Sequence, residues 1–465
     1  MPGKSSGSPM REISPEKSRK RSYLMKKIAF TTFGCKVNQY ETAAFISGFQ
    51  ELGHAIEPTS EQADIVVINT CAVTAKAGGQ SRQAIRRTLR RNRRARVVIT
   101  GCYAQLAADE IGAMEELEGR SYSIVGNGDK HELLRAALAV SENPILLRDP
   151  REDATTISPL PLRRFKGRTR AYLRIQDGCD AFCSYCIVPY TRGRSRSLPI
   201  AQVLHQVEIF RRQGYKEIVV TGIHVGNYGG DLAEKTDIAD IMDRLCRSVS
   251  DVRFRLSSIE PTEISDKLLD TMAQNNNFMP HLHIPLQSGA DDILLRMNRR
   301  YSTERFMAVL ENCHKAIEDV AVGLDILAGF PGETDTHFSH AYSFLEKLDF
   351  TYLHVFPYSR RPGTPAADFD DQVPGNIKDR RVARLRRLGE AKKQSFYQKH
   401  LGSRRTLLVE NARDASGMLK GFTDNYIPVL IAGEDSLKNS IVDVLLQQDK
   451  KRTIYGKLIS KNDER

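Results

Sequence analysis

From about Lys26, the hydrophobic positions form short β-branched runs separated by stretches with helical periodicity. The first four of these runs are KIAFTTFG, DIVVINT, RVVITG and SIVG. Strands that alternate with helices along a chain are typical of a parallel sheet with helices packed on it. We therefore expect an amino-terminal α/β domain over residues 26–148.

A second series of strand-like runs also alternates with helical segments. Its six members are RAYLRI, KEIVVTG, VRFRLSS, HLHIPLQ, AVGLDILAG and TYLHVFPY. Six βα units over residues 165–398 predict a partial, TIM-like (β/α)6 barrel with its active site at the carboxyl ends of the strands. A polar, proline-containing stretch over residues 149–164 predicts a linker between the two α/β domains.

The two ends of the chain lack the alternation of strands and helices seen in the two α/β domains. After a basic helical segment, the runs RTLLVE, YIPVLI, SIVDVLLQ and TIYGKLI predict a small antiparallel barrel over residues 399–465. Pro428 within YIPVLI predicts an edge strand or a bulge, because proline has no N–H to donate to a sheet. Residues 1–25, rich in Ser, Pro, Lys and Arg, predict a disordered basic tail.

Charge and composition narrow the functional class. Lys and Arg total 69 against 57 Asp and Glu, a net charge of +12 that favours a polyanionic partner such as nucleic acid. The sequence has no apolar run long enough for a membrane span and no signal-peptide core, so we expect a cytoplasmic protein without membrane contact. In that reducing compartment, the eight cysteines favour metal binding or catalysis over disulfides.

Three cysteines lie together after the first strand of the predicted barrel. Cys179, Cys183 and Cys186 occur in QDGCDAFCSYCIVPYTRGRSRS. Iron–sulfur clusters normally take four thiolates, so three leave one iron open to the amino and carboxylate groups of S-adenosylmethionine. Zinc is the alternative, but zinc sites usually carry two CxxC pairs and no second pair is present. The loop therefore predicts a cluster that reductively cleaves S-adenosylmethionine.

A second group of cysteines follows three strands of the amino-terminal domain. Cys35, Cys71 and Cys102 each lie just past a strand-like run. The carboxyl ends of parallel strands meet at one edge, where ligands bind. One buried cysteine is unremarkable, but three at equivalent strand ends predict a second three-thiolate 4Fe–4S site with an iron open to sulfide or methylsulfide.

Two weaker metal candidates receive no assignment. Cys246 and Cys313 lie in helical segments of the barrel, and we expect them to be ordinary buried thiols. Of His281 and His283 in HLH, we expect only one to point into the barrel.

These motifs resemble a known family. CxxxCxxC with Tyr185 before its last cysteine resembles the signature of the radical S-adenosylmethionine superfamily. With GCKVNQYET, the chain from about Lys26 to Ile459 resembles the methylthiotransferases, and within them the bacterial tRNA branch that acts on N6-threonylcarbamoyladenosine. That family joins an amino-terminal cluster domain, a radical barrel and a carboxyl-terminal RNA-binding TRAM module, in agreement with the three segments predicted above.

The resemblance also implies contacts to S-adenosylmethionine. Tyr185 would lie near the adenine, and polar or glycine residues at later strand ends would bind the rest of the cofactor. Each glycine also fits an ordinary tight turn, and a solvated helix charge is the alternative for the arginine. The residues at these later positions are Thr221, Gly222, Gln287, Ser288, Arg299, Gly329 and Gly332. Beyond the six cysteines and these contacts, we assign no catalytic residue.

The implied activity is transfer of a methylthio group to carbon 2 of N6-threonylcarbamoyladenosine at position 37 of tRNA. It implies two 4Fe–4S clusters and S-adenosylmethionine as cofactors, an electron donor such as flavodoxin or ferredoxin, and a sulfur donor. The basic stretches RQAIRRTLRRNRRAR and Arg380–Arg387 fit either phosphate contacts or solvated faces.

Other functions remain open. A methylthiotransferase could instead act on tRNA carrying N6-isopentenyladenosine or on an aspartate of a ribosomal protein; by resemblance, GCKVN speaks against both. A function of another class is a cluster-containing RNA-binding or redox-sensing protein. Such a protein needs no second set of strand-end cysteines, so we rank this class last.

Overall fold

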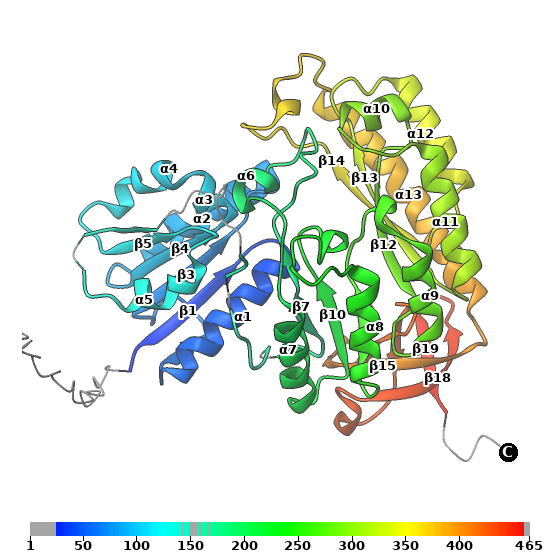
Figure 1. Cartoon of the computed structure of the whole chain (residues 1–465), viewed down its shortest axis with the longest axis horizontal. Helices are drawn as coiled ribbons and strands as arrows, with labels where there is room; N and C mark the ends of the chain where they lie inside the picture. Colours follow the sequence, from blue (N-terminus) through cyan, green and yellow to red (C-terminus); the bar gives the residue numbers. More distant parts are fainter. Residues whose placement is uncertain (1–24, 142, 148–155, 159, 166, 460–465) are drawn as a thin grey trace, which may run out of the picture.

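The computed structural model describes residues 25–141, 143–147, 156–158, 160–165 and 167–459. In Figure 1 an amino-terminal sheet domain lies on the left, a larger barrel with outer helices on the right, and a small barrel below it. The expected basic tail, apart from its last residue, and much of the expected linker lie outside the described residues. No described helix is both long and apolar enough to span a membrane.

The amino-terminal domain is built on a parallel sheet of strand order β2-β1-β3-β4-β5-β6. Helices α1 and α5 pack on one face and α2 on the other, so the central strands are buried on both sides. The strands are β1 (Lys27–Thr32), β2 (Ala55–Glu57), β3 (Ile65–Thr70), β4 (Arg96–Gly101), β5 (Tyr122–Val125) and β6 (Ile145–Leu147). The helices are α1 (Lys36–Glu51), α2 (Ala75–Arg91), α3 (Cys102–Leu106), α4 (Ala108–Gly112) and α5 (Leu133–Leu138).

All six predicted strands of the second domain are present. They form two parallel three-stranded sheets, β11-β10-β7 and β12-β13-β14, which a single bridge between Phe254 and Phe278 connects. The strands are β7 (Ala171–Arg174), β10 (Glu217–Thr221), β11 (Arg253–Leu256), β12 (His281–Gln287), β13 (Ala321–Ala328) and β14 (Tyr352–Pro357). The partial barrel is therefore two half-barrels that share a hydrophobic core.

Helices cover the outside of this barrel (Figure 1), and a short two-stranded ribbon flanks the cysteine loop in the sequence. The helices are α7 (Ile200–Arg212), α8 (Ile238–Ser248), α9 (Asp266–Gln274), α10 (Asp291–Arg296), α11 (Thr303–Ala316) and α12 (Asp335–Lys347). The ribbon pairs β8 (Gln176–Asp177) with β9 (Arg196–Ser197), and helix α6 (Val188–Arg192) lies between these strands in sequence.

The basic helical segment is one long helix, α13 (Gly375–Lys399), which leads into a closed five-stranded barrel. All strand pairs of the closed barrel are antiparallel except β17 with β19. Its strands are β15 (Arg404–Arg413), β16 (Leu419–Thr423), β17 (Pro428–Ile431), β18 (Ile441–Gln448) and β19 (Ile454–Leu458). The expected edge or bulge at Pro428 is wrong, because Pro428 opens β17 in a closed barrel, a position that also needs no ladder N–H.

Hydrogen bonds and an ion pair dock the closed barrel on the larger one. Arg170 Nη1 lies 2.6 Å from Glu410 Oε1, and the Asn411 backbone N–H donates to Thr169 Oγ1 at 3.0 Å. Arg255 Nη2 donates to the Asp424 carbonyl at 3.0 Å. The two barrels thus share charged groups at their joint.

Candidate active site

The structure brings the three strand-end cysteines of the amino-terminal domain to one edge of the sheet. Cys35 follows β1, Cys71 directly follows β3, and Cys102 follows β4 and opens α3, and these three strands are neighbours. Gly34 has φ +93°, and a Cβ there would lie 2.9 Å from Cys71 Sγ, so the backbone before Cys35 passes directly against Cys71. The predicted gathering of these cysteines is therefore confirmed.

The chemistry of this edge fits a three-thiolate cluster. Burial, together with the neighbouring Cys102 and Cys35, raises the pKa of the Cys71 thiol to about 11. Cys35 is open to solvent, yet the protein packed around it also raises the pKa of its thiol. None of the three cysteines is in a disulfide. Thiols that disfavour a bare negative charge gain from a metal that takes up that charge.

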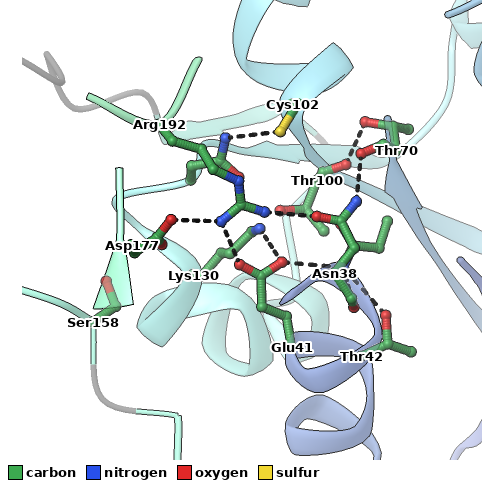
Figure 2. A network of polar contacts seen from close by, with 12 residues as sticks. Asn38, Glu41, Thr42, Thr70, Thr100, Cys102, Lys130, Ser158, Asp177 and Arg192 are labelled. Atoms are coloured by element: carbon green, nitrogen blue, oxygen red, sulfur yellow. Dashed lines mark hydrogen bonds and ion pairs between the residues drawn. The ribbon is translucent and has the colours of Figure 1, made fainter. Parts of the chain in front are cut away.

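A buried network of charges joins this edge to the cysteine loop of the barrel (Figure 2). Arg192 of α6, which is 1% exposed, donates through Nη1 to Glu41 Oε1 at 3.0 Å and to Asp177 Oδ1 at 2.9 Å. Its Nη2 donates to Asn38 Oδ1 at 2.6 Å. Lys130, also buried, forms a second ion pair with Glu41. Arg192 therefore ties helix α1 of the sheet domain to the loop after β7.

The same network reaches the cysteines. Asn127 Nδ2 donates to the Thr191 carbonyl at 2.8 Å and lies 3.8 Å from Cys102 Sγ. Although burial alone would raise it, the Arg192 and Arg174 guanidinium groups hold the pKa of Asp177 well below its usual range. The carboxylates are thus charged and compensated, as buried ions must be.

The cysteine loop of the barrel has its own hydrogen-bonding environment. Arg299 Nη1 donates to Cys183 Sγ at 3.3 Å, and His224 Nδ1 lies 3.3 Å from Cys179 Sγ. Burial raises the pKa of Cys186 to about 12, and the adjacent Cys183 adds to this effect. Three thiols on one loop, with cationic groups aimed at two sulfurs, fit a cluster whose sulfurs accept hydrogen bonds from the protein.

A cavity of about 280 Å³ lies against this loop. Polar and charged side chains dominate its wall, where Arg299 pairs with Glu260 and its Nε donates to Tyr301 Oη at 3.0 Å. The lining residues are Asp180, Ala181, Cys183, His224, Asn227, Glu260, Thr262, Glu263, Asn298, Arg299, Arg300 and Tyr301. Arg299 is therefore a buried group at the cysteine loop, and the solvated helix charge considered from sequence is wrong.

The predicted cofactor contacts at strand ends occupy several environments. Thr221 is the buried last residue of β10, and a Cβ on the next residue, Gly222, would lie 2.7 Å from Gln176 Oε1. Gln287 ends β12 with φ 68°, and Ser288 beside it is buried. These four positions line up along the carboxyl ends of two barrel strands, one in each half-barrel. Their contacts to the cofactor stay predictions.

Tyr185 and the two later glycines lie around the carboxyl end of the next strand, β13, which pairs with β12. The Tyr185 ring packs edge-on against Phe330, with centroids 6.4 Å apart, and its electrostatic neighbours include Arg299 and Cys183. A Cβ on Gly332 would lie 2.7 Å from Asp371 Oδ2, and both Gly329 and Gly332 have positive φ. Both glycines therefore have the backbone geometry of turns, and their cofactor role stays a prediction.

Sequence reasoning missed several charged residues of the site. His224 follows β10 in TGIHVGNYG, and its Nε2 lies 2.6 Å from Glu263 Oε1. Burial would lower its pKa, but the Cys179 sulfur and Glu263 together raise it to about 10. Arg192 was visible in the motif VPYTRGRSRS, but nothing in the spacing linked it to Glu41, which lies 151 positions away.

A larger cavity of about 890 Å³ lies between the half-barrels and the closed barrel. Its wall includes Lys36 at the cysteine edge, and burial and the nearby Arg255 lower the pKa of this lysine. His281 and His283 both line the cavity. The expectation that only one points inward is wrong, because residues two apart on a strand share a face.

His283 forms a hydrogen-bonded cluster with side chains of the two neighbouring strands, β13 and β14. Asp325 Oδ1 lies 3.0 Å from His283 Nε2 and 3.2 Å from His354 Nδ1. Such a group has the donor types of a cation site. Burial would raise the pKa of Asp325, but the two imidazoles hold it well below its usual range. The carboxylate is therefore already compensated by the protein.

Family models match both α/β domains. The Radical SAM superfamily model matches residues 173–345, and the model of uncharacterized protein family UPF0004 matches residues 27–119. The chain is 39% identical to the threonylcarbamoyladenosine tRNA methylthiotransferase MtaB of Bacillus subtilis (strain 168), over 90% of this chain and 93% of that protein. A tRNA-2-methylthio-N(6)-dimethylallyladenosine synthase of Fusobacterium nucleatum is 32% identical, over 94% of this chain and all of that protein.

Solved structures agree at the level of the fold. The radical S-adenosylmethionine methyltransferase TsrM from Kitasatospora setae, with cobalamin and a 4Fe-4S cluster bound, matches with a TM-score of 0.53 and 16% identity, over 74% of this chain and 77% of that one. The assignment to a family therefore rests on the sequence relatives, whose alignments cover nearly the full length of both chains. The chain belongs to the radical S-adenosylmethionine methylthiotransferases, enzymes that use S-adenosylmethionine and 4Fe–4S clusters.

Proposed function

We propose that this enzyme adds a methylthio group to carbon 2 of N6-threonylcarbamoyladenosine in tRNA. The observation that carries the proposal is the placement of two three-cysteine groups, from different domains, around the mouth of one partial barrel. Relatives from Bacillus subtilis and Rickettsia prowazekii, at 39% and 38% identity, bear the name of this substrate. Relatives named for dimethylallyladenosine match at 32% or less.

Each cysteine group has a separate role in this proposal. Cys179, Cys183 and Cys186 hold the cluster that binds S-adenosylmethionine, and the other three cysteines hold the second cluster. When bound, these groups supply a radical that removes the hydrogen from carbon 2 and a methylated sulfur that takes its place. The C–H bond has no useful acidity, so a general base would not serve.

The chain's own residues position and shield these groups. Arg299 donates to the Cys183 sulfur, His224 contacts the Cys179 sulfur, and Arg192 ties α1 to the loop after β7. The large cavity accepts an adenine that has left its stack, and its protein walls exclude water from the reacting carbon. Positioning of this kind is the protein's main contribution when cofactors carry the chemistry.

The proposal also assigns the domains, the tRNA contacts, the electron and sulfur donors and the cellular compartment. We assign residues 26–148 to the cluster domain, 165–398 to the radical core and 399–465 to a TRAM-like RNA-binding module. The arginine row of α2 (Arg82, Arg86, Arg87, Arg90 and Arg91) would contact tRNA phosphates, which position a substrate without specifying it. A flavodoxin or ferredoxin would supply electrons, a separate donor would supply sulfur, and the reaction would take place in the cytoplasm.

The test is mass spectrometry of tRNA nucleosides from a strain that lacks this gene. We expect 2-methylthio-N6-threonylcarbamoyladenosine to disappear and to return with the wild-type gene. Unchanged nucleosides would reject the proposal, and so would loss of the methylthio-isopentenyl nucleoside alone. A change confined to a ribosomal protein aspartate would reassign the substrate.

A further inference from the structure

One wall of the large cavity carries a positive charge next to the cysteine edge. Lys36 directly follows Cys35, lines the cavity and lies within electrostatic range of Arg255 and Asp325 on the barrel strands. Within the described residues, no hydrogen bond or ion pair engages its ammonium group. The Lys36 side chain thus points from the sheet domain into the barrel with donors to spare.

The carboxylates nearby are already committed to other groups. Asp325 pairs with His283 and His354, as described above. Glu217, at the joint of the two barrels, pairs with Arg170 Nε at 2.8 Å and with Arg255 Nε at 3.0 Å. The two acidic side chains that line the cavity are also paired, Glu410 with Arg170 and Glu390 with Lys393. Among the described wall residues, no carboxylate is therefore free to neutralise Lys36.

Arg255 supplies a second unused donor on the same wall. Its side chain is 2% exposed, and its Nε and Nη2 are used on Glu217 and on the Asp424 carbonyl. Its Nη1 has no hydrogen-bond partner among the described residues. A buried guanidinium nitrogen without a partner is costly, so this nitrogen marks a place for an acceptor from outside the chain.

We infer that Lys36, with Arg255 behind it, binds the carboxylate of the threonylcarbamoyl group. The inference rests on the proposed function and identifies the part of the substrate by which the enzyme recognises it. In adenine, N6 and carbon 2 lie on the same Watson–Crick edge, so the substituent on N6 extends beside the reacting carbon. That carbon must face the cysteine edge where the sulfur is delivered, and Lys36 is adjacent to Cys35 on that edge.

The rest of the cavity suits the remainder of such a nucleoside. Phe422 and Tyr426 stack with centroids 4.8 Å apart on the wall formed by the closed barrel, and Tyr352 lies on the barrel side. Arg170 and Arg255 already lie over the Phe422 and Tyr426 rings, so these rings give the wall apolar surface rather than free stacking faces. The cavity of about 890 Å³ is in the usual range for nucleoside-sized ligands. A neutral isopentenyl group would leave the Lys36 ammonium and Arg255 Nη1 without an acceptor, which disfavours that substrate.

The experiment varies the charge on the protein and on the RNA together. Anaerobically reconstituted full-length enzyme is given anticodon stem-loops that carry either N6-threonylcarbamoyladenosine or its neutral threonine-carboxamide analogue. We measure the Kd of each RNA by fluorescence anisotropy and kcat/KM for methylthio product. For the wild type we expect a preference for the carboxylate of about 30-fold, the range for loss of one partner of a buried charge pair.

Lys36→Gln should reduce this preference to about threefold or less, and Lys36→Arg should restore most of it. The matched control is Lys393→Gln, which removes a lysine from the outer wall of the same cavity that already pairs with Glu390. It should change both RNAs equally, if at all. Iron content and circular dichroism identify any variant that fails to assemble. If Lys36→Gln fails, the RNA preference of Lys36→Arg is compared with that of the wild type instead.

The two levels of inference fail separately. If the wild type makes no product from the threonylcarbamoyl stem-loop, the proposed function is wrong. If it makes product but Lys36→Gln keeps the full carboxylate preference, the function stands and the assignment of Lys36 is overturned. Equal use of both RNAs by the wild type also overturns the assignment, because the enzyme then does not distinguish the charged carboxylate from the neutral carboxamide.

Discussion

Cys179 and Cys35 belong to different domains, and their loss should remove different halves of the reaction. Cys179→Ala removes a proposed ligand of the cluster that would hold S-adenosylmethionine, so 5′-deoxyadenosine should no longer form. Cys35→Ala leaves that loop intact, so 5′-deoxyadenosine should still form while no methylthio product appears. Anaerobic assays of both products, with iron counted per chain, check the prediction. Methylthiolation by Cys35→Ala would contradict a role for the second cysteine group.

Single residues also set the limit of what sequence can predict. The six cysteines were identifiable because CxxxCxxC is a local pattern and because strand ends of a parallel sheet meet at one edge. Lys36, Glu41, Arg192 and His224 carry no such pattern. The role of each depends on a partner that is distant in the sequence. Glu41 and Arg192, for example, are 151 positions apart.

At the scale of elements, the network of Figure 2 fixes helix α1 against helix α6. Glu41 accepts from both Arg192 and Lys130 in a fully buried setting. Glu41→Gln removes the charge that compensates these two cations, and breaking a buried pair typically costs about 3–5 kcal/mol. We expect a loss of that size in the free energy of unfolding, measured by denaturant titration of the cluster-free protein.

The matched control for this variant is a surface pair of the same domain. Lys27 and Glu57 lie 3.6 Å apart with Lys27 about half exposed, and such pairs contribute about 0–1 kcal/mol. Lys27→Ala should therefore leave the unfolding midpoint nearly unchanged. Equal effects of the two variants would show that the network contributes no more than surface charges do.

Element prediction succeeded where runs were long and failed where they were short. All six barrel strands and the four central strands of the first sheet, β1, β3, β4 and β5, follow from β-branched runs flanked by helices. Strands β2 and β6 have three residues each, and β16 contains Gly421, so none presents a sustained hydrophobic pattern. The division of the barrel into two half-sheets depends on long-range pairing, which leaves no local trace.

At the scale of the whole molecule, Glu217 makes the joint between the two barrels sensitive to acid. Burial would raise its pKa, but Arg255 and Arg170 lower it from 4.5 to about 2. Because the pKa is lower in the folded chain, this stabilisation is complete above about pH 4.5 and is lost as the pH falls towards 2. A shift of this size corresponds to on the order of 3 kcal/mol.

Denaturation of the cluster-free protein between pH 7 and pH 3 checks this prediction. Glu217→Gln should be less stable than the wild type at pH 7, and the difference should shrink as the pH falls below about 4.5. Lys27→Ala should follow the wild-type curve throughout. A constant difference between Glu217→Gln and the wild type at all pH values would contradict the role given to this carboxylate.

The partial barrel, with its two half-sheets packed on one hydrophobic core, has a consequence for protein engineering. Its open side is walled by Lys36 from the sheet domain and by Phe422 and Tyr426 from the closed barrel, so three domains build one pocket. Domain exchange between relatives of different substrate preference should then transfer selectivity with the amino-terminal domain, although the radical chemistry resides elsewhere.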